Sequence, residues 1–287
     1  MVARVDQSPF GSRAPGPLDR AVLALTRAMP NSWLGRRLSI LFRRGTTMRL
    51  GDGALDTELW GMKLRLYPRS NGCERNALFT PQMYDVFERK LLADAIEHRR
   101  RGGGDFVFVD IGANVGLYSL FVASRGGPAT RIVAFEPQPG ILDRLRFNLA
   151  ANPAVKIDLH AVALSDRDGM VDLLIDGDDS GGTRIDSVAG STGGEAVSVP
   201  CRPLTAVLAE AGITAIDALK IDVEGAEDLV LGPFLRDAPK RLLPDLVLIE
   251  DTSGLWRTDV FALLAQHGYT VSARNRQNVA LRRMGQG

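Results

Sequence analysis

The stretch that decides the fold is Val107-Phe-Val-Asp-Ile-Gly-Ala-Asn-Val-Gly-Leu-Tyr-Ser-Leu120. Its apolar first part ends in Asp110, a turn spaced by Gly112 and Gly116 follows, and a helical pattern begins at Leu117. This order predicts a buried strand, a tight loop and a helix N-terminus, an arrangement that brings backbone N–H groups up to a ligand. Because a carboxylate before the first glycine would repel a phosphate group, the loop favours a ligand that carries a positive charge.

Strand and helix patterns alternate from this stretch toward the C-terminus. We expect strands at residues 106–110, 131–136, 156–161, 218–221, 246–250, 270–273 and near 279–282. We expect helices at residues 117–124, 140–151, 204–211 and 228–235. The alternation predicts an α/β fold with a parallel sheet that helices cover on both faces. Within residues 166–200 a strand at 169–175 is followed by glycine-rich segments at 176–182 and 190–194, so we expect an edge-strand insertion with mobile loops.

Residues 1–50 are strongly basic. They hold nine arginines, two aspartates and no glutamate, a balance of +7 that leaves −6 for the remaining chain. Apolar residues recur at helical spacing from Leu18 to Met29 and form a second stripe from Trp33 to Phe42. We expect a basic arm, partly disordered or amphipathic helical. It either lies on an anionic membrane or grips an acidic substrate, or it packs on its own domain with solvated arginines.

Residues 51–103 are expected to form a hairpin and a cap helix. Weak alternation around Gly61 predicts the hairpin at residues 55–67. Thr80 followed by Pro81 is typical of a helix start, so we expect a helix from there to about Arg100. The glycines at 102–104 form a joint, and residues 104–287 form the ligand-binding domain.

Length and composition restrict the function classes. A chain of 287 residues with 45% apolar and 24% charged residues can hold one large α/β domain with an extension. A net charge of +1 does not indicate a nucleic-acid partner. Cys73 and Cys201 can form neither a disulfide framework nor a zinc cluster, which favours a cytoplasmic protein. No apolar run approaches the roughly 18 residues of a membrane span.

The second strand ends in Glu136, and an acid at this point of a doubly wound sheet faces the ribose of an adenosine ligand. A dinucleotide site makes the same demand, but its fingerprint is G-x-G-x-x-G. The stretch from Gly112 to Gly116 is instead G-x-x-x-G, with Asn114 in place of the second glycine. The loop therefore favours S-adenosylmethionine, which carries an ammonium and a sulfonium, over a nicotinamide dinucleotide.

Asp166 follows the third strand, where a segment close to the adenine is expected. Its carboxylate could accept a hydrogen bond from the adenine amino group. It could equally be an Asx-turn residue that leads into Gly169.

The fourth strand leads into three acids within six positions, Asp222, Glu224 and Glu227, more than packing alone explains. Glu227 fits the first turn of a helix, where the dipole favours an acid. Asp222 and Glu224 are therefore the candidate catalytic residues, and His160 is the reserve base.

The fifth strand also ends in acids, Glu250 and Asp251. Together with Asp222 they would suit a divalent cation such as Mg²⁺. The alternative, in which Glu250 orients the substrate or a loop arginine, is the one we favour, and we assign no metal ligand.

Four stretches resemble the FkbM family of methyltransferases. They are Val109-Asp-Ile-Gly-Ala-Asn-Val-Gly-Leu-Tyr-Ser119, Val133-Ala-Phe-Glu-Pro137, Ala163-Leu-Ser-Asp166 and Leu219-Lys-Ile-Asp-Val-Glu-Gly-Ala-Glu227. The resemblance implies a class I, Rossmann-like fold with a mostly parallel seven-stranded sheet and an antiparallel C-terminal hairpin. It also implies that Asp110, Gly112, Asn114 and Gly116 line the methionine end of S-adenosylmethionine and that Glu136 contacts the ribose.

We therefore expect an S-adenosylmethionine-dependent methyltransferase that most often acts on a hydroxyl of a sugar, glycan or natural product. Asp222 or Glu224 would accept the hydroxyl proton. We expect a cytoplasmic protein with peripheral membrane contact through residues 1–50 as an option. Two alternatives stay open: an NAD-dependent oxidoreductase of a nucleotide-sugar or alcohol, and a non-catalytic binding module that the basic arm recruits to a membrane.

Overall fold

The computed structural model describes residues 5–175, 183–185 and 195–284. The N-terminal region contains α1 (Pro17–Ala28), α2 (Trp33–Leu50), β1 (Leu55–Leu59), β2 (Met62–Leu66), α3 (Gly72–Phe79) and α4 (Val86–Arg101). The strands that follow are β3 (Phe106–Ile111), β4 (Thr130–Phe135), β5 (Ile157–His160), β6 (Ala163–Leu164), β7 (Gly169–Ile175), β8 (Thr183–Ile185), β9 (Glu195–Arg202), β10 (Ala218–Ile221), β11 (Leu246–Glu250), β12 (Tyr269–Arg274) and β13 (Asn278–Arg283). The helices between them are α5 (Leu117–Gly126), α6 (Pro139–Ala150), α7 (Leu204–Glu210), α8 (Glu227–Asp237) and α9 (Val260–Gln266).

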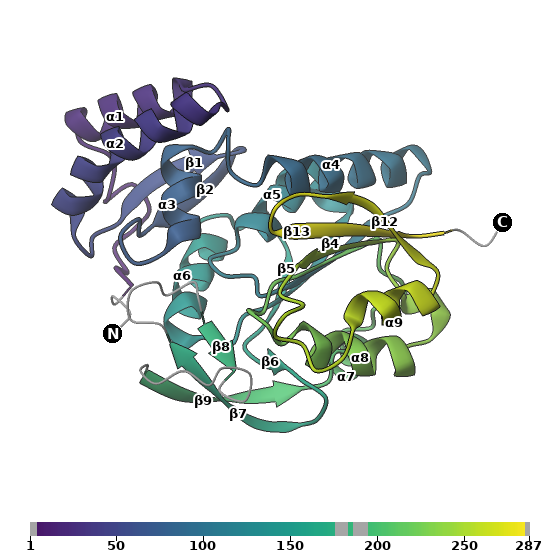
Figure 1. Ribbon diagram of the computed structural model, residues 1–287. Helices are drawn as coiled ribbons and strands as arrows, with labels where there is room; N and C mark the ends of the chain where they lie inside the picture. The colour runs from purple at the N-terminus through teal and green to yellow at the C-terminus, as the bar shows by residue number, and fades with distance from the viewer. Residues whose placement is uncertain (1–4, 176–182, 186–194, 285–287) are drawn as a thin grey trace.

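A seven-stranded sheet forms the centre of the molecule (Figure 1). Its order is β12-β13-β11-β10-β3-β4-β5. The five strands from β11 to β5 in this order run parallel, whereas β13 is antiparallel to both of its neighbours. This arrangement confirms the expected class I fold, including the antiparallel C-terminal hairpin.

Apolar helix faces cover both sides of the sheet. On one side, Leu92 of α4 and Phe121 of α5 pack against Phe106 and Phe108 of β3. On the other side, residues of α7, α8 and α9 pack against alternate positions of the same strands, such as Val109. The side chains of one strand point alternately to the two layers, so a polar residue inside such a strand is enclosed by helices.

The segment after β5 forms a sheet of its own, so the expected edge-strand insertion in the main sheet is wrong. β7 is present as expected, but its partner is β9, with which it pairs antiparallel from Gly169 opposite Cys201 to Ile175 opposite Glu195. This partner was missed, and the second sheet has the order β6-β9-β7-β8. The two glycine-rich segments expected to be mobile lie outside the described residues.

The hairpin of β1 and β2 is present, but the helix start expected at Thr80 is wrong. Thr80 ends α3, because its N–H and its hydroxyl both donate to the carbonyl of Asn76. The chain then turns, and Asp85 adopts a left-handed conformation with φ 39° immediately before α4. A left-handed residue interrupts helical hydrogen bonding, so α4 begins only at Val86.

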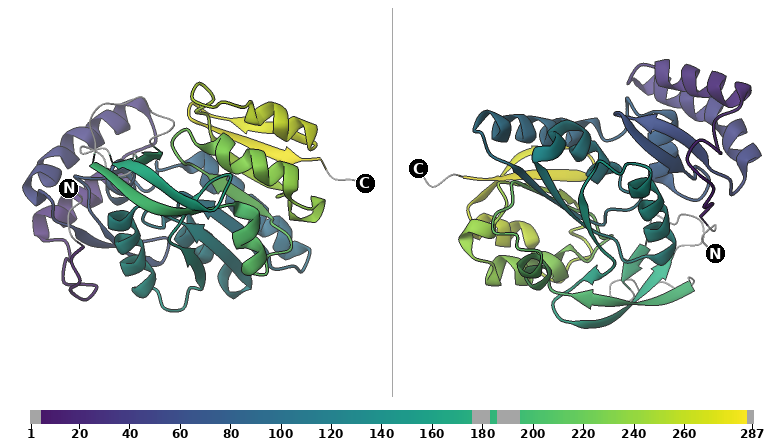
Figure 2. Two further views of the ribbon diagram at one scale, coloured as in Figure 1. Left: turned by 90° about the horizontal axis from the view of Figure 1, so that it is seen from below. Right: turned by 180° about the vertical axis from the view of Figure 1, so that it is seen from behind.

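The chain before α1 lies on the β1–β2 hairpin. The buried guanidinium of Arg65 donates to both carboxylate oxygens of Asp56 at 2.7 and 2.8 Å, and to the carbonyl oxygens of Asp6, Ser8 and Pro9. A bidentate ion pair of this kind fixes the relative orientation of the two side chains as well as their distance. Figure 2 shows that α1 and α2, which follow, stand at the outer edge of the molecule.

Candidate active site

A pocket opens at the carboxyl ends of β3, β4 and β10. β3 has β4 on one side and β10 on the other, and ligands of open α/β sheets bind where the strand order reverses in this way. The pocket holds about 1010 Å³ of space, part of which is open solvent. Its polar and charged lining residues are Cys73, Tyr84, Asp85, Asn114, Tyr118, Glu136, Lys220, Asp222 and Glu224.

The glycine loop between β3 and α5 forms one wall of the pocket. Gly112 has φ +76°, and a Cβ built there would lie only 1.9 Å from the backbone oxygen of Asp222. Gly116 has φ +87° and precedes α5, and a Cβ there would lie 2.5 Å from Leu145 Cδ1. Backbone conformation favours glycine at both positions, and at Gly112 the close approach of the Asp222 backbone adds a second reason.

Asn114 holds the loop from inside. Its own φ is +51°, and its side-chain oxygen accepts hydrogen bonds from Asn71 Nδ2 at 3.0 Å and from the N–H of Val115 at 2.9 Å. Asn71 also caps α3 by accepting from the N–H of Glu74. Asn71 thus joins the N-terminal region to the glycine loop at the pocket wall. Sequence reasoning did not identify this residue.

Glu136 ends β4 and is 7% exposed. Its carboxylate accepts hydrogen bonds from the backbone N–H groups of Asn114 at 2.8 Å and Gln138 at 2.9 Å. Burial raises the pKa of Glu136 to about 7, although these two N–H groups act in the opposite direction. Each carboxylate oxygen can accept more than one hydrogen bond, so acceptor capacity remains for hydroxyl groups of a ligand.

Asp110 lies beneath the pocket and does not line it. It is fully buried, its Oδ2 accepts from the Ser119 hydroxyl at 2.6 Å, and its Oδ1 has no partner among the described residues. Burial raises the pKa of Asp110, while the Lys220 ammonium opposes that shift. Asp110 and Lys220 are neighbours across the parallel pairing of β3 with β10.

Lys220 is a site residue that sequence reasoning missed. Its Nζ lies 3.1 Å from Asp222 Oδ2 and 4.8 Å from the ring centre of Tyr118. Burial alone would lower the pKa of Lys220, but the charges of Asp222 and Asp110 outweigh it and raise the pKa above its ordinary value. A lysine inside the apolar strand Ala218-Leu-Lys-Ile221 was the signal that could have revealed it, since lysine is almost never buried without a partner.

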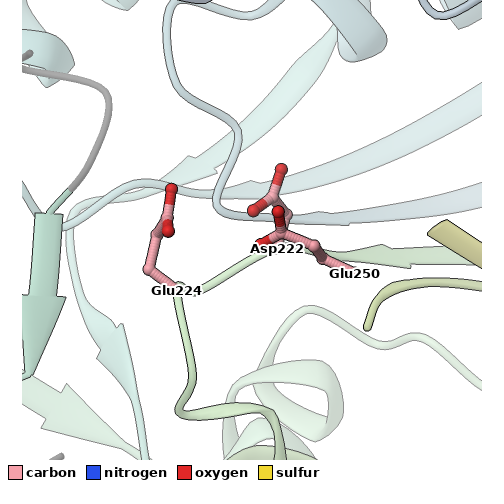
Figure 3. A group of neighbouring side chains, drawn as sticks. All are labelled: Asp222, Glu224 and Glu250. Atoms are coloured by element: carbon pink, nitrogen blue, oxygen red, sulfur yellow. The ribbon is translucent and has the colours of Figure 1, made fainter. Parts of the chain in front are cut away.

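Asp222, Glu224 and Glu250 bring their carboxyl groups together at the ends of β10 and β11, as Figure 3 shows. One oxygen of each lies within 4.8 Å of the others. Burial and the negative charges of Asp222 and Glu224 raise the pKa of Glu250 to about 8, and the Glu250 Oε2 has no hydrogen-bond partner among the described residues. Asp222 and Glu224 line the pocket, and Glu250 stands next to them.

This acidic group has the oxygen ligands that a divalent cation prefers. Asp251, which the sequence placed in the same set, points elsewhere and lies 3.5 Å from Arg274. A cation at the group would compete with the Lys220 ammonium for Asp222. The acids can therefore also be explained as the counter-charge of a buried lysine.

Glu227 positions the loop that carries Asp222 and Glu224. The sequence predicted only a helix first-turn acid, and α8 does begin there. Glu227 is, however, fully buried, and its Oε1 accepts from the N–H groups of Val223 and Gly225. Its Oε2 accepts from the Thr252 hydroxyl at 2.6 Å and from Trp256 Nε1 at 2.7 Å.

Two residues that the sequence suggested lie outside the pocket lining. His160 stacks on Phe135 with ring centres 5.2 Å apart, and its Nε2 lies 3.3 Å from Asp158 Oδ1. Asp166 is exposed, and its Oδ1 lies 3.2 Å from Arg167 Nη1. The residues that do line this side of the pocket are apolar: Val162, Ala163 and Leu164.

The charges of the lining fit a cationic ligand. Four carboxyl groups and one ammonium line the pocket, and the carboxyl groups of Asp110 and Glu250 lie close behind the lining. Three regions of the pocket suit the three parts of S-adenosylmethionine. The apolar surface toward β6 suits the adenine, and the acceptor capacity of Glu136 suits the ribose. The acids beyond the glycine loop suit the cationic methionine part.

Comparison with known proteins identifies the family. Residues 110–271 match the model of the methyltransferase FkbM domain. The chain is 33% identical to the AMB antimetabolite synthetase AmbE of Pseudomonas aeruginosa over 59% of this chain, but it spans only 10% of AmbE's length. It is 33% identical to the 31-O-demethyl-FK506 methyltransferase FkbM of Streptomyces tacrolimicus, covering 59% of this chain and 74% of that protein. It is 32% identical to the 2-O-methyltransferase NoeI of Sinorhizobium fredii, covering 45% and 57%.

These matches support neither the oxidoreductase nor the non-catalytic alternative. The matched residues include the glycine loop, Glu136 and the acid-bearing loop after β10. The chain belongs to the FkbM family of S-adenosylmethionine-dependent methyltransferases.

Proposed function

We propose that this chain methylates a hydroxyl oxygen of a sugar, glycan or natural product. The names of two relatives, an FK506 O-methyltransferase and a 2-O-methyltransferase, support oxygen as the accepting atom. The observation that carries the proposal is the carboxyl group cluster at the pocket, because methylation of a hydroxyl requires a proton acceptor next to the reacting oxygen.

We propose that Glu136 binds the ribose and that the loop from Gly112 to Gly116 receives the methionine part. Asp110 acts from beneath the loop, through Ser119 of α5 and Lys220. When bound, S-adenosylmethionine supplies the methyl group and leaves as S-adenosylhomocysteine. The chain's own contribution is to hold the acceptor oxygen in line with that methyl group, since correct positioning accounts for a large share of the barrier reduction.

We propose the Asp222–Glu250 pair as the general base. Asp222 lines the pocket, and its Oδ2 lies 3.1 Å from the Lys220 ammonium. As the new O–C bond forms and the S–C bond breaks, the hydroxyl proton passes to the Asp222 carboxylate, which shares the local negative charge with Glu250. Burial and the neighbouring carboxylates raise the pKa of Glu250 to about 8, so this group can hold a proton close to neutral pH next to Asp222. Glu224, in the same acidic group, would hydrogen-bond the acceptor.

The cofactor assignment is tested by thermal unfolding with S-adenosylhomocysteine. We expect the ligand to raise the Tm of the unaltered protein and NAD to leave it unchanged. Glu136→Ala should abolish the ligand-induced rise, while Asp166→Ala, which alters an acid outside the pocket lining, should retain it. An equal rise in both variants would contradict the assignment of Glu136 to the ribose.

The acceptor is tested by transfer of a labelled methyl group to fractionated glycans and small metabolites. We expect an alkali-stable ether as the product, because a methyl ester would be hydrolysed. Asp222→Asn should lower kcat by about 10²–10⁴-fold with S-adenosylhomocysteine binding retained. Label in an N-methyl or ester product would reject the hydroxyl acceptor, and undiminished turnover of Asp222→Asn would reject the base.

A further inference from the structure

The second helix, α2, has the reverse of the usual distribution of side chains. Its buried residues are Gly35, Ser39 and Thr46, which lie along one side of an α-helix. Gly35 is required there, because a Cβ would lie 2.2 Å from the carbonyl oxygen of Pro30. A helix on the surface of a globular protein normally buries its apolar stripe and exposes its polar one.

The outward side of α2 is apolar. Trp33 is 68% exposed, Leu41 66% and Met48 69%. Leu34 and Ile40 are also more than half exposed. Positions 33, 41 and 48 fall on the side opposite Gly35 and Thr46, so these side chains form one continuous strip along the helix. We call this strip, together with Arg37 and Arg44 within it, the α2 outer face.

The charge of α2 is uniformly positive. The helix contains five arginines and no acid. Arg49 pairs with Asp19, whereas Arg37 and Arg44 form no ion pair within the described part of the chain. The Arg37 guanidinium lies 4.5 Å from the ring centre of Trp33, so it rests on the apolar strip instead of meeting a carboxylate.

We propose that the α2 outer face binds the surface of an anionic phospholipid bilayer, with the helix in the plane of the interface. Tryptophan and leucine enter the boundary between headgroups and acyl chains, and arginines contact phosphate groups. A second copy of this chain fits the surface less well, because pairing two such faces would bring arginines together without any acid. Among the described helices, none has the length and apolar character of a membrane span.

Helix α3 connects α2 to the pocket wall. Arg43 of α2 donates to Asn76 of α3 at 2.8 Å, and Cys73 of the same α3 lines the pocket. Figure 1 shows α1, α2 and α3 together on one side of the central sheet. This inference does not rest on the identity of the methyl acceptor.

Co-sedimentation with vesicles tests the proposal. We expect the full chain to bind vesicles of phosphatidylglycerol mixed with phosphatidylcholine at least tenfold more strongly than vesicles of phosphatidylcholine alone. Added salt should weaken this binding, because the arginines contribute by charge. Equal binding to both vesicles, or none to either, would overturn the proposal.

Two pairs of variants separate the apolar and the charged contributions. Leu41→Gln should lower vesicle binding several-fold, whereas Met170→Gln, at a 61% exposed position on β7, should not. Arg37→Gln with Arg44→Gln should lower binding by about 25-fold, at about fivefold for each arginine near a membrane surface. The matched control is Arg146→Gln with Arg236→Gln, two exposed arginines that pair with neighbouring acids.

Circular dichroism and the Tm establish that these variants are folded. Unchanged binding by folded Leu41→Gln would overturn the proposal. Light scattering should show a single copy per particle in the absence of lipid. A dimer that Leu41→Gln dissociates would assign the α2 outer face to self-association instead.

Discussion

The pocket and the α2 outer face depart from the ordinary distribution of side chains in opposite ways. The pocket encloses charged groups, with Asp110 fully buried and Lys220 8% exposed, whereas α2 turns its apolar side chains to solvent. In the pocket each charge has a partner or a raised pKa, so the cost of burial is offset within the protein. On α2 nothing within the described chain covers the apolar strip. Departures from the ordinary pattern therefore mark two kinds of site, one completed internally and one that an external surface would complete.

The comparison predicts opposite effects for the same substitution in the two regions. Gly112→Ala should destabilise the fold by more than about 4 kcal/mol, because the added Cβ would meet a backbone oxygen at 1.9 Å in a left-handed conformation. Gly45→Ala, inside α2 with nothing within 4 Å of the added Cβ, should stabilise it by about 0.5–1 kcal/mol. Chemical denaturation measures both. Similar effects of the two substitutions would remove the contrast.

Charge removal should also affect the two regions differently. Lys220→Met leaves Asp110 and Asp222 without their shared cation and should cost about 3 kcal/mol of unfolding free energy. Arg44→Met removes an exposed arginine with no ion pair in the described structure and should change that free energy by less than about 0.5 kcal/mol. A loss in Arg44→Met as large as that in Lys220→Met would show that α2 depends on its charges for folding.

A third effect, smaller than those of Gly112→Ala and Lys220→Met, depends on pH. In the folded chain the pKa of Glu250 is raised from 4.5 to about 8, so folding favours the protonated form. This contribution is fully present below pH 4.5 and is lost as the pH rises to about 8. Glutamine does not titrate, so the stability of Glu250→Gln does not fall in this way. The difference in Tm, variant minus unaltered protein, should therefore increase from pH 5 to pH 9. Glu250 is partly exposed, and after allowance for screening the gain corresponds to about 2 kcal/mol.

Glu58→Gln, at an exposed position of β1, is the control for this titration. Its Tm should follow that of the unaltered protein over the whole pH range. A constant difference between Glu250→Gln and the unaltered protein from pH 5 to 9 would contradict the raised pKa. The same Glu250→Gln variant should transfer methyl groups more slowly, so the substitution would separate stability from activity.

The central sheet could be predicted from the sequence because its strands are apolar runs bounded by acids, glycines and helical patterns. The positions of the glycine loop and Glu136 were predicted for the same reason. Each directly follows an apolar strand, so it lies at the carboxyl end of that strand. The start of α4 was wrong because Thr80 was already used to end α3. β9 was missed because its partner β7 lies across the glycine-rich segment, and a ladder between distant strands leaves little local signal.

Contacts between distant residues set the rest of the site, and no local pattern records them. Asn71 meets Asn114 across 43 positions, and Glu227 meets Trp256 across 29. Lys220 was visible as a charge inside an apolar strand, yet its partner Asp110 lies on another strand. Residue types could therefore indicate that a site exists, but only the fold shows which acid serves which cation.

Glu227 has a consequence for how acceptor preference can change during evolution. Its single carboxylate fastens the loop that carries Asp222 and Glu224 and also the segment that contains Thr252 and Trp256. A change in one segment therefore disturbs the carboxylate that also holds the other. Exchange of residues 251–258 with a relative would preserve turnover only where a hydroxyl at 252 and an indole at 256 are kept, so new specificities should arise from the other walls of the pocket.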